Sequence, residues 1–158
     1  MRDTRNKTDT IAGLTVEPGS ANGQPLVLAE PLSFWGGYDS SSGAIVDPVH
    51  PNRGATMRNR ILLMTRSKGS SSSSSVLAEA IRNGTGPLAI VMLESDLIVA
   101  LGAIVARELY GIQVPIVVVD SDAWQRLVKI DSELLVQADA LCDATISWSR
   151  QPARKHSA

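Results

Sequence analysis

Three apolar segments of strand length, separated by two segments of helical length, constrain the fold of this chain more than any other feature. They are "NRILLMT" (59–65), "PLAIVML" (87–93) and "VPIVVVD" (114–120). A strand that is apolar at nearly every position is buried on both faces, which is typical of a parallel sheet covered by helices. The order therefore predicts an α/β domain with a central parallel β-α-β-α-β unit.

The two segments between these strands carry helix signals. In the first, the apolar residues fall on one helix face ahead of Gly84, a residue that commonly ends a helix: Val76, Leu77, Ala80 and Ile81. The second, residues 96–111, begins at Asp96, which suits the positive start of a helix, and ends at Gly111.

The residues on either side of this unit indicate further strands. We expect one strand over 26–29, stopped by Pro31, a short one over 44–47, and one or two over 133–148. One or two helical turns are expected over 122–128. Strand-rich flanks around a parallel unit favour a layered β/β/α domain.

The two ends of the chain differ from its middle. Residues 1–10 are polar and charged, and residues 149–158 are basic and lack periodicity. We expect a disordered N-terminal tail and a flexible basic C-terminal tail. A single domain would then occupy residues 11–148, a length that can bury one hydrophobic core.

Charge and hydropathy argue against several classes of partner. The formal net charge is −1, and no basic stripe lies outside the ends, so a nucleic-acid partner is not expected. The first ten residues lack the apolar core of a secretory signal, and the most apolar run, 97–106, is too short to span a bilayer. The sequence predicts a soluble cytoplasmic protein that binds no membrane.

Cysteine and histidine are too scarce to build a metal centre inside the chain. The sequence has one cysteine, Cys142, and two histidines, His50 and His156. A structural zinc or iron–sulfur site needs about three or four such ligands. Any metal that the protein uses is therefore expected on another chain, and Cys142 is expected to pack in the interior.

Six consecutive serines, Ser70 to Ser75, join the first apolar strand to the first helix. A serine run is often a flexible linker, but here both neighbours belong to one β-α-β unit, where loops are short. Ligands bind at this edge of α/β sheets, and a helix start offers unpaired amides and partial positive charge to anions. With Lys68 and Gly69, the run is interpreted as a cradle for carboxylate or phosphate. A P-loop is excluded, because the order is Lys-Gly-Ser rather than Gly-Lys-Ser/Thr.

Three stretches together resemble the small subunit, or swivel domain, of the aconitase X family. They are "LVLAEPLSFWGGYDSSSGAIVDPVHP" (26–51), "RSKGSSSSSSVLAEAIRNGTGPLAIVM" (66–92) and "IVALGAIVARELYGIQVPIVVVD" (98–120). The resemblance covers nearly the whole chain. It implies an aconitase-like swivelling β/β/α domain over residues 11–148.

The resemblance also implies a reaction and a partner. Aconitase-like enzymes remove water from a hydroxy acid, with an iron or iron–sulfur centre on a large subunit acting on the leaving hydroxyl. The swivel domain supplies the serine that takes the proton. That serine follows the glycine of the loop, which corresponds to Ser70 here. The expected protein is one half of a heterodimeric hydro-lyase, active only with the large subunit.

Members of the family differ in substrate. Bacterial members include cis-3-hydroxy-L-proline dehydratases, which form Δ1-pyrroline-2-carboxylate, and archaeal members dehydrate mevalonate 5-phosphate. The unbroken serine run and "FWGG" (34–37) favour the hydroxyproline group. Two alternatives stay open: the small subunit of a mevalonate 5-phosphate dehydratase, and a non-catalytic module that binds a carboxylate.

Several residues near these motifs are candidates for binding the substrate. Paired glycines let the backbone approach a ligand closely, and Trp35 or Phe34 could wall a small ring. The candidates are Ser33, Trp35, Gly36, Gly37, His50, Lys68, Gly69 and Ser71. Three structural interpretations stay open beside these roles: Ser70 as a helix cap, "SFWGG" (33–37) as a tight turn with core aromatics, and His50 as a residue that stabilises its own turn.

Overall fold

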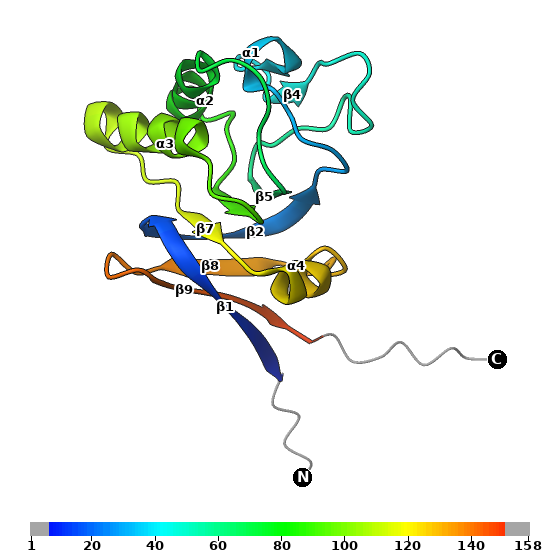
Figure 1. Cartoon of the computed structure of the whole chain (residues 1–158), viewed down its shortest axis with the longest axis vertical. Coiled ribbons are helices and arrows are strands. Elements are labelled where there is room, and N and C mark those ends of the chain that lie inside the picture. The colour runs from blue at the N-terminus through cyan, green and yellow to red at the C-terminus, as the bar shows by residue number, and fades with distance from the viewer. Residues whose placement is uncertain (1–6, 151–158) are drawn as a thin grey trace, which may run out of the picture.

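A computed structural model describes residues 7–150 of the chain (Figure 1). Seven of its strands form a closed barrel. These are β1 (Thr8–Glu17), β2 (Gly19–Val27), β5 (Arg60–Met64), β6 (Ala89–Met92), β7 (Ile116–Val118), β8 (Leu134–Ala138) and β9 (Asp143–Ser149). The remaining elements are the pair β3 (Tyr38–Asp39) and β4 (Ala44–Ile45), and the helices α1 (Phe34–Gly37), α2 (Ser73–Arg82), α3 (Leu97–Tyr110) and α4 (Ser121–Leu127).

The barrel combines parallel and antiparallel pairing. Its strand order is β1-β7-β6-β5-β2-β8-β9, and β9 pairs with β1 to close it. β2, β5, β6 and β7 run parallel, which confirms the predicted parallel unit. β1, β8 and β9 add antiparallel pairs around it.

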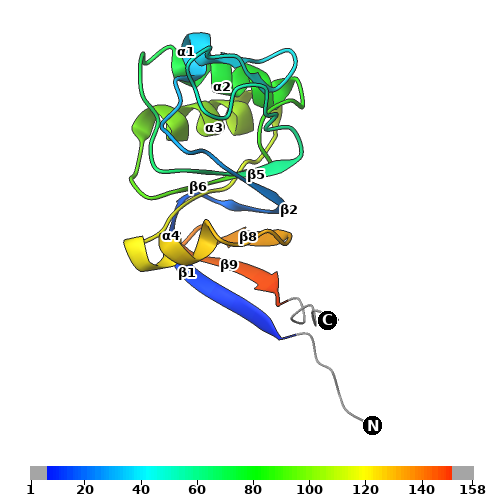
Figure 2. The same cartoon turned by 90° about the vertical axis from the view of Figure 1, so that its right-hand side faces the viewer.

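The domain has three layers, as the resemblance implied. Figures 1 and 2 show α2 and α3 above the layer of β2, β5, β6 and β7, with β1, β8 and β9 below. In β5, Leu62 and Met64 belong to the hydrophobic cluster under the helices, whereas Ile61 and Leu63 belong to the cluster inside the barrel. All four side chains are buried, because each face of this strand has its own core. Double burial explains the continuous apolar run.

The predicted tail boundaries were wrong at both ends. Thr8 to Thr10 lie in β1, where Thr8 pairs with Ser149 and Thr10 with Ser147. Ser149 is the last residue of β9 rather than the first of a tail. β1 and β9 hydrogen-bond each other's backbone groups, so these polar residues are ordered in strands although their composition is typical of a disordered tail. Residues 1–6 and 151–158, and with them the rest of both predicted tails, lie outside the described residues.

Cys142 was also predicted wrongly. It is exposed in the turn between β8 and β9, with a backbone φ of 87°. Tight hairpin turns need residues in this left-handed region, so the turn geometry, not burial, governs this position. The structure therefore does not support the predicted interior packing of Cys142.

α3 is joined to the barrel by an ion pair that is largely hidden from solvent. Arg107 Nη1 donates to Glu17 Oε1 over 2.6 Å, and the Glu17 side chain is 3% exposed. Burial raises the pKa of the Glu17 carboxyl above its usual value, and the Arg107 charge opposes this shift.

Between residues 7 and 150, no helix has the length and apolar character that crossing a bilayer requires.

We predict that Arg107→Met destabilises the fold by about 2 kcal/mol at pH 7, because it leaves a buried carboxylate unpaired. Removing Arg107 takes away the attraction that opposes desolvation, so the pKa of Glu17 rises further. A raised carboxyl pKa weakens the folded state only where that group ionises, so the loss should shrink as pH falls toward 4. Urea unfolding at both pH values measures it.

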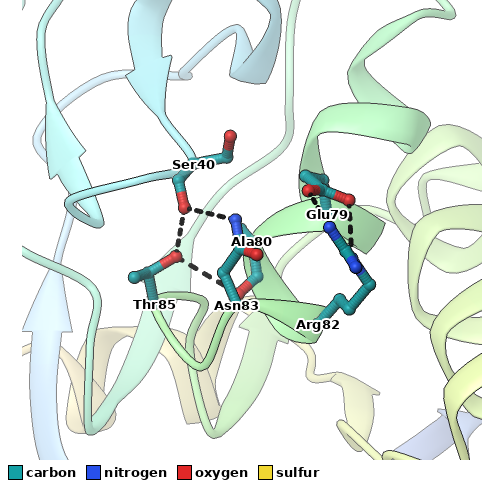
Figure 3. Close-up of polar contacts among 6 residues, drawn as sticks. All are labelled: Ser40, Glu79, Ala80, Arg82, Asn83 and Thr85. Atoms are coloured by element: carbon teal, nitrogen blue, oxygen red, sulfur yellow. Dashed lines mark hydrogen bonds and ion pairs between the residues drawn. The ribbon is translucent and has the colours of Figure 1, made fainter.

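Arg82→Met is the matched control. Arg82 also pairs with a glutamate, Glu79, over 2.7 Å (Figure 3), but the Arg82 side chain is 51% exposed and that of Glu79 41%. Exposed pairs contribute little, so this variant should unfold almost like the wild type at both pH values. Equal losses in the two variants, or a loss in Arg107→Met that does not change with pH, would contradict the assignment.

Candidate active-site loop

The serine run begins in a loop at the carboxyl ends of the parallel strands. Residues 65–72 leave β5 and lead directly into α2. On one side of the loop, Lys68 N donates to Leu32 O over 3.1 Å, and Leu32 forms a parallel bridge with Ser67. On the other side, Glu94 N donates to Thr65 O over 3.0 Å. The loop thus continues the sheet pairing beyond β5, so it is not a linker between domains.

Asp96 holds the loop and the start of α3 together. Its Oδ1 accepts hydrogen bonds from Ile98 N (2.9 Å) and Val99 N (3.2 Å), and its Oδ2 accepts from Ser67 Oγ and Ser67 N. Burial alone would raise the pKa of the Asp96 carboxyl, but these hydrogen bonds outweigh it and leave the pKa below its usual value. Asp96 is therefore ionised near neutral pH and binds two segments at once.

Gly69 and Ser33 pack directly against each other. Gly69 has a φ of +94°, and a Cβ added there would overlap Ser33 Oγ and lie 3.0 Å from Ser33 Cβ. Ser33 Oγ itself donates to Trp35 O over 2.8 Å. Both the backbone angle and the lack of space explain why a glycine precedes the serines.

Ser73 fixes the first turn of α2 from inside. Its side chain is buried, and its Oγ accepts a hydrogen bond from Trp35 N over 3.1 Å. The helix begins at Ser73, three residues before the predicted apolar face. Half of the serine run is therefore helix, and only Ser70 to Ser72 belong to the exposed loop.

The segment 33–40 also secures the far end of α2. Ser40 O accepts hydrogen bonds from Thr85 Oγ1 (2.5 Å) and Asn83 Nδ2 (3.2 Å), as Figure 3 shows. Tyr38 donates its hydroxyl to Thr85 O over 2.8 Å, and burial raises the pKa of Tyr38 to about 12, so this donor keeps its proton. One segment thus holds α2 at its first turn and just beyond its last.

Before α2, the exposed serines of the run are Ser70, Ser71 and Ser72. Ser70 Oγ accepts a hydrogen bond from Ser72 N over 3.1 Å, and Ser70 O accepts one from Ser73 N over 3.0 Å. Among residues 7–150, the amides of Gly69, Ser70 and Ser71 have no acceptor. These amides and the exposed Lys68 side chain are available to the oxygens of an anion.

The residues of "SFWGG" lie beside this loop, as the contacts of Ser33 and Trp35 show. Trp35 is 60% exposed. Gly36 has a φ of +80° with no atom within 4 Å of an added Cβ. Gly37 is buried, and its carbonyl accepts hydrogen bonds from Val46 N and Asp47 N. The structure therefore brings Ser33 and Trp35 to the serine loop, while Gly37 is part of the scaffold.

His50 does not fit its candidate role. It is 4% exposed, its Nε2 lies 3.0 Å from Glu30 O, and its Nδ1 accepts a hydrogen bond from Asn52 N over 3.0 Å. Both ring nitrogens are engaged by the backbone, so neither is left for a substrate. The structural interpretation, in which His50 stabilises its own turn, is the one that these contacts support.

Three residues that position the loop were not among the candidates: Ser67, Ser73 and Asp96. Ser73 precedes Leu77 and Ala80 by four and seven residues, so helical spacing places it on the buried face. Asp96 was expected only at a helix start. Its bond to Ser67 joins residues 29 positions apart, which no local pattern reveals.

No metal centre is evident near the loop. Among residues 7–150, no group of three or more His, Cys, Asp or Glu side chains converges to hold a metal ion. One hollow of about 610 Å³ lies elsewhere, between β1, β2, β8, β9 and residues 131–133. The serine loop is open to solvent instead, so the fold and site define an α/β domain with an exposed, anion-accepting loop at the strand ends.

Comparisons with known proteins place this domain in a family. Residues 10–144 match the family described as "Aconitase X swivel domain". The chain is 45% identical over 106 residues to a cis-3-hydroxy-L-proline dehydratase of Pseudomonas aeruginosa, a match that covers 67% of this chain and 18% of the relative. It is 36% identical over 124 residues to the phosphomevalonate dehydratase small subunit of Methanothermobacter thermautotrophicus, covering 78% and 90%.

A solved structure supports the same grouping. Aconitase X of Thermococcus kodakaraensis, in its holo-form, superposes with a TM-score of 0.73 at 30% identity, over 87% of this chain and 98% of that one. The chain belongs to the aconitase X swivel-domain family. It spans about a fifth of the Pseudomonas relative but nearly all of the Methanothermobacter subunit.

We predict that Gly69→Ala displaces the serine loop. The added methyl group meets Ser33 in a backbone conformation that alanine rarely adopts, so the fold should lose about 2 kcal/mol or more. Gly54→Ala is the control, because Gly54 has a similar φ of +87° with open space around it. It should cost about 1 kcal/mol from backbone strain alone. Equal losses in urea unfolding would show that packing against Ser33 does not matter.

Proposed function

We propose that this chain is the small subunit of an aconitase-X-type hydro-lyase that dehydrates a small hydroxy acid. The observation that carries the proposal is the serine loop: an exposed hydroxyl, Ser70, on a loop anchored to its neighbours and lined by unpaired amides. Family membership supplies the reaction class, since relatives that match are named dehydratases.

Ser70 is proposed to accept the α-proton of the substrate. A neutral serine hydroxyl is a very poor base, so Ser70 is proposed to act as an alkoxide, which becomes a hydroxyl again when it takes the α-proton. Ser70 Oγ already accepts a hydrogen bond from Ser72 N. The positive potential of the first turn of α2 and the charge of Lys68 also favour negative charge on this oxygen. As the proton moves to Ser70, the hydroxyl on the neighbouring carbon leaves. An iron or iron–sulfur centre on the large subunit would supply Lewis-acid assistance to that leaving group.

Ser71 and the free amides are proposed to bind the substrate carboxylate. These amides belong to Gly69, Ser70 and Ser71, just before α2, and they can donate hydrogen bonds to the carboxylate oxygens while Lys68 neutralises the charge. Trp35 is exposed beside the loop, so its ring could form one wall for a small cyclic substrate. Ser33 and Gly36, on either side of Trp35, would set the position of its ring. Ser33 also packs directly against Gly69 of the serine loop.

The preferred substrate is cis-3-hydroxy-L-proline, with Δ1-pyrroline-2-carboxylate as product. The cations in the loop sequence are Arg66 and Lys68, which suits one carboxylate better than a carboxylate and a phosphate together. Mevalonate 5-phosphate is the second candidate, because the chain covers 90% of a phosphomevalonate dehydratase small subunit. A non-catalytic carboxylate-binding module is the third.

The setting of the enzyme stays a prediction from sequence. We infer a cytoplasmic heterodimer in which this chain binds neither nucleic acid nor membrane. The partner would be a large subunit of the same family, because relatives of this length are named small subunits.

We predict that Ser70→Ala, combined with the large subunit, lowers turnover by at least about a thousandfold, since the proton acceptor is lost. Assembly of the pair should not change. Ser75→Ala is the control: Ser75 is exposed in the first turn of α2 and should keep full turnover. Steady-state dehydration assays with cis-3-hydroxy-L-proline and with mevalonate 5-phosphate measure both the effect and the substrate.

The outcomes separate the three candidates. Turnover of only one substrate by the wild-type pair identifies it. Full turnover in Ser70→Ala would overturn the role of Ser70. Tight carboxylate binding by the isolated chain, with no turnover of either compound by the pair, would favour the binding module.

A further inference from the structure

The helix α3 is apolar on every side, yet one side is uncovered. Residues 97–106 read "LIVALGAIVA", with no polar or charged side chain. The inner residues of α3 are buried against the domain: Val99, Ala100, Ala103 and Ala106. On the outside, Leu97 is 84% exposed, Leu101 50% and Leu109 68%. We name these three leucines, with the half-buried Ile104 and Val105 between them, the α3 stripe.

Such a stripe is unusual on a folded domain. Single exposed apolar residues are normal, but a continuous row along one helix marks a surface that another body covers. A helix that is apolar all round is normally buried all round. α3 has 14 residues, fewer than a helix needs to cross a bilayer.

The stripe is continuous with the serine loop. Leu97 directly follows Asp96, whose carboxylate binds Ser67 in that loop. A body that covers Leu97 therefore lies beside the exposed serines. At the other end of α3, Arg107 and Glu108 form an ion pair over 2.9 Å. An apolar centre with charged groups at its margin is the usual composition of a protein–protein interface.

We propose that the α3 stripe is the docking surface for the large subunit, which would meet it with an apolar face. This inference rests on the proposed function, which requires a second chain over the serine loop. The relatives support that occupant: one is named a small subunit, and in the Pseudomonas protein the matched part is 18% of the chain, so most of that protein lies outside this domain. Docking along α3 would hold the partner next to Ser70.

The test is a double variant, Leu97→Glu with Leu101→Glu, co-expressed with the large subunit of the same organism. Both leucines are at least half exposed, and glutamate is a good helix former, so the isolated chain should unfold at the wild-type temperature. The affinity for the large subunit should fall about 30-fold or more, because charges replace the apolar centre of the interface. Size-exclusion chromatography and titration calorimetry measure assembly.

Leu141→Glu is the matched control. Leu141 is 85% exposed in the turn between β8 and β9, which lie on the other side of β2 and β7 from α3 (Figure 1), and its replacement should leave assembly unchanged. Wild-type affinity in the double variant would overturn the proposal, and so would a wild-type chain that does not assemble with the large subunit. A concentration-dependent homodimer that the double variant abolishes would also overturn it, because a second copy would then cover the stripe.

Failure of the interface and failure of the proposed function give different results. If the wild-type pair assembles through the stripe but dehydrates neither hydroxy acid, the interface stands and the proposed reaction falls. If the double variant assembles normally and the pair dehydrates its substrate, the reaction stands and the docking surface lies elsewhere.

Discussion

β5, β6 and β7 are buried on both faces, between the helices above and the barrel interior below, and the position of every other functional feature follows from this double burial. Because the three strands run parallel, all their carboxyl ends meet at one edge. The serine loop after β5 and the Asp96 turn after β6 are therefore neighbours. The parallel pairing of β5 and β6 places the two segments side by side, and Asp96 joins them by its hydrogen bonds to Ser67.

Hydrogen bonds then convert a serine-rich sequence into a defined loop. Asp96 binds Ser67, the Ser73 hydroxyl binds the Trp35 amide, and Gly69 packs on Ser33. These contacts leave the neighbouring Ser70 to Ser72 exposed but anchored at both ends. A loop that is already ordered loses little conformational entropy when it binds a ligand, which suits a site that a second subunit completes.

The sequence predicts well what local periodicity encodes and poorly what long-range pairing decides. The three core strands and two main helices follow from continuous or helical apolar patterns. β1 was missed, because residues such as Thr8 and Thr10 are polar and it is pairing with β9 and β7 that defines the strand. The loop was found from its position in a β-α-β unit, whereas its supports were not, since Ser67–Asp96 and Ser33–Gly69 join residues distant in the chain. His50 has a side chain that could bind a substrate, and only the three-dimensional structure shows that backbone groups occupy both of its ring nitrogens.

Preorganisation of the serine loop is the central claim, and ¹⁵N relaxation of the isolated chain tests it most directly. Amide order parameters of Ser67 to Ser73 should be about 0.85, equal to those of β5, because the loop is fixed without a partner or substrate. Values below about 0.6 across Ser70 to Ser72 would contradict the account, since they would describe a mobile linker that gains its shape only on binding.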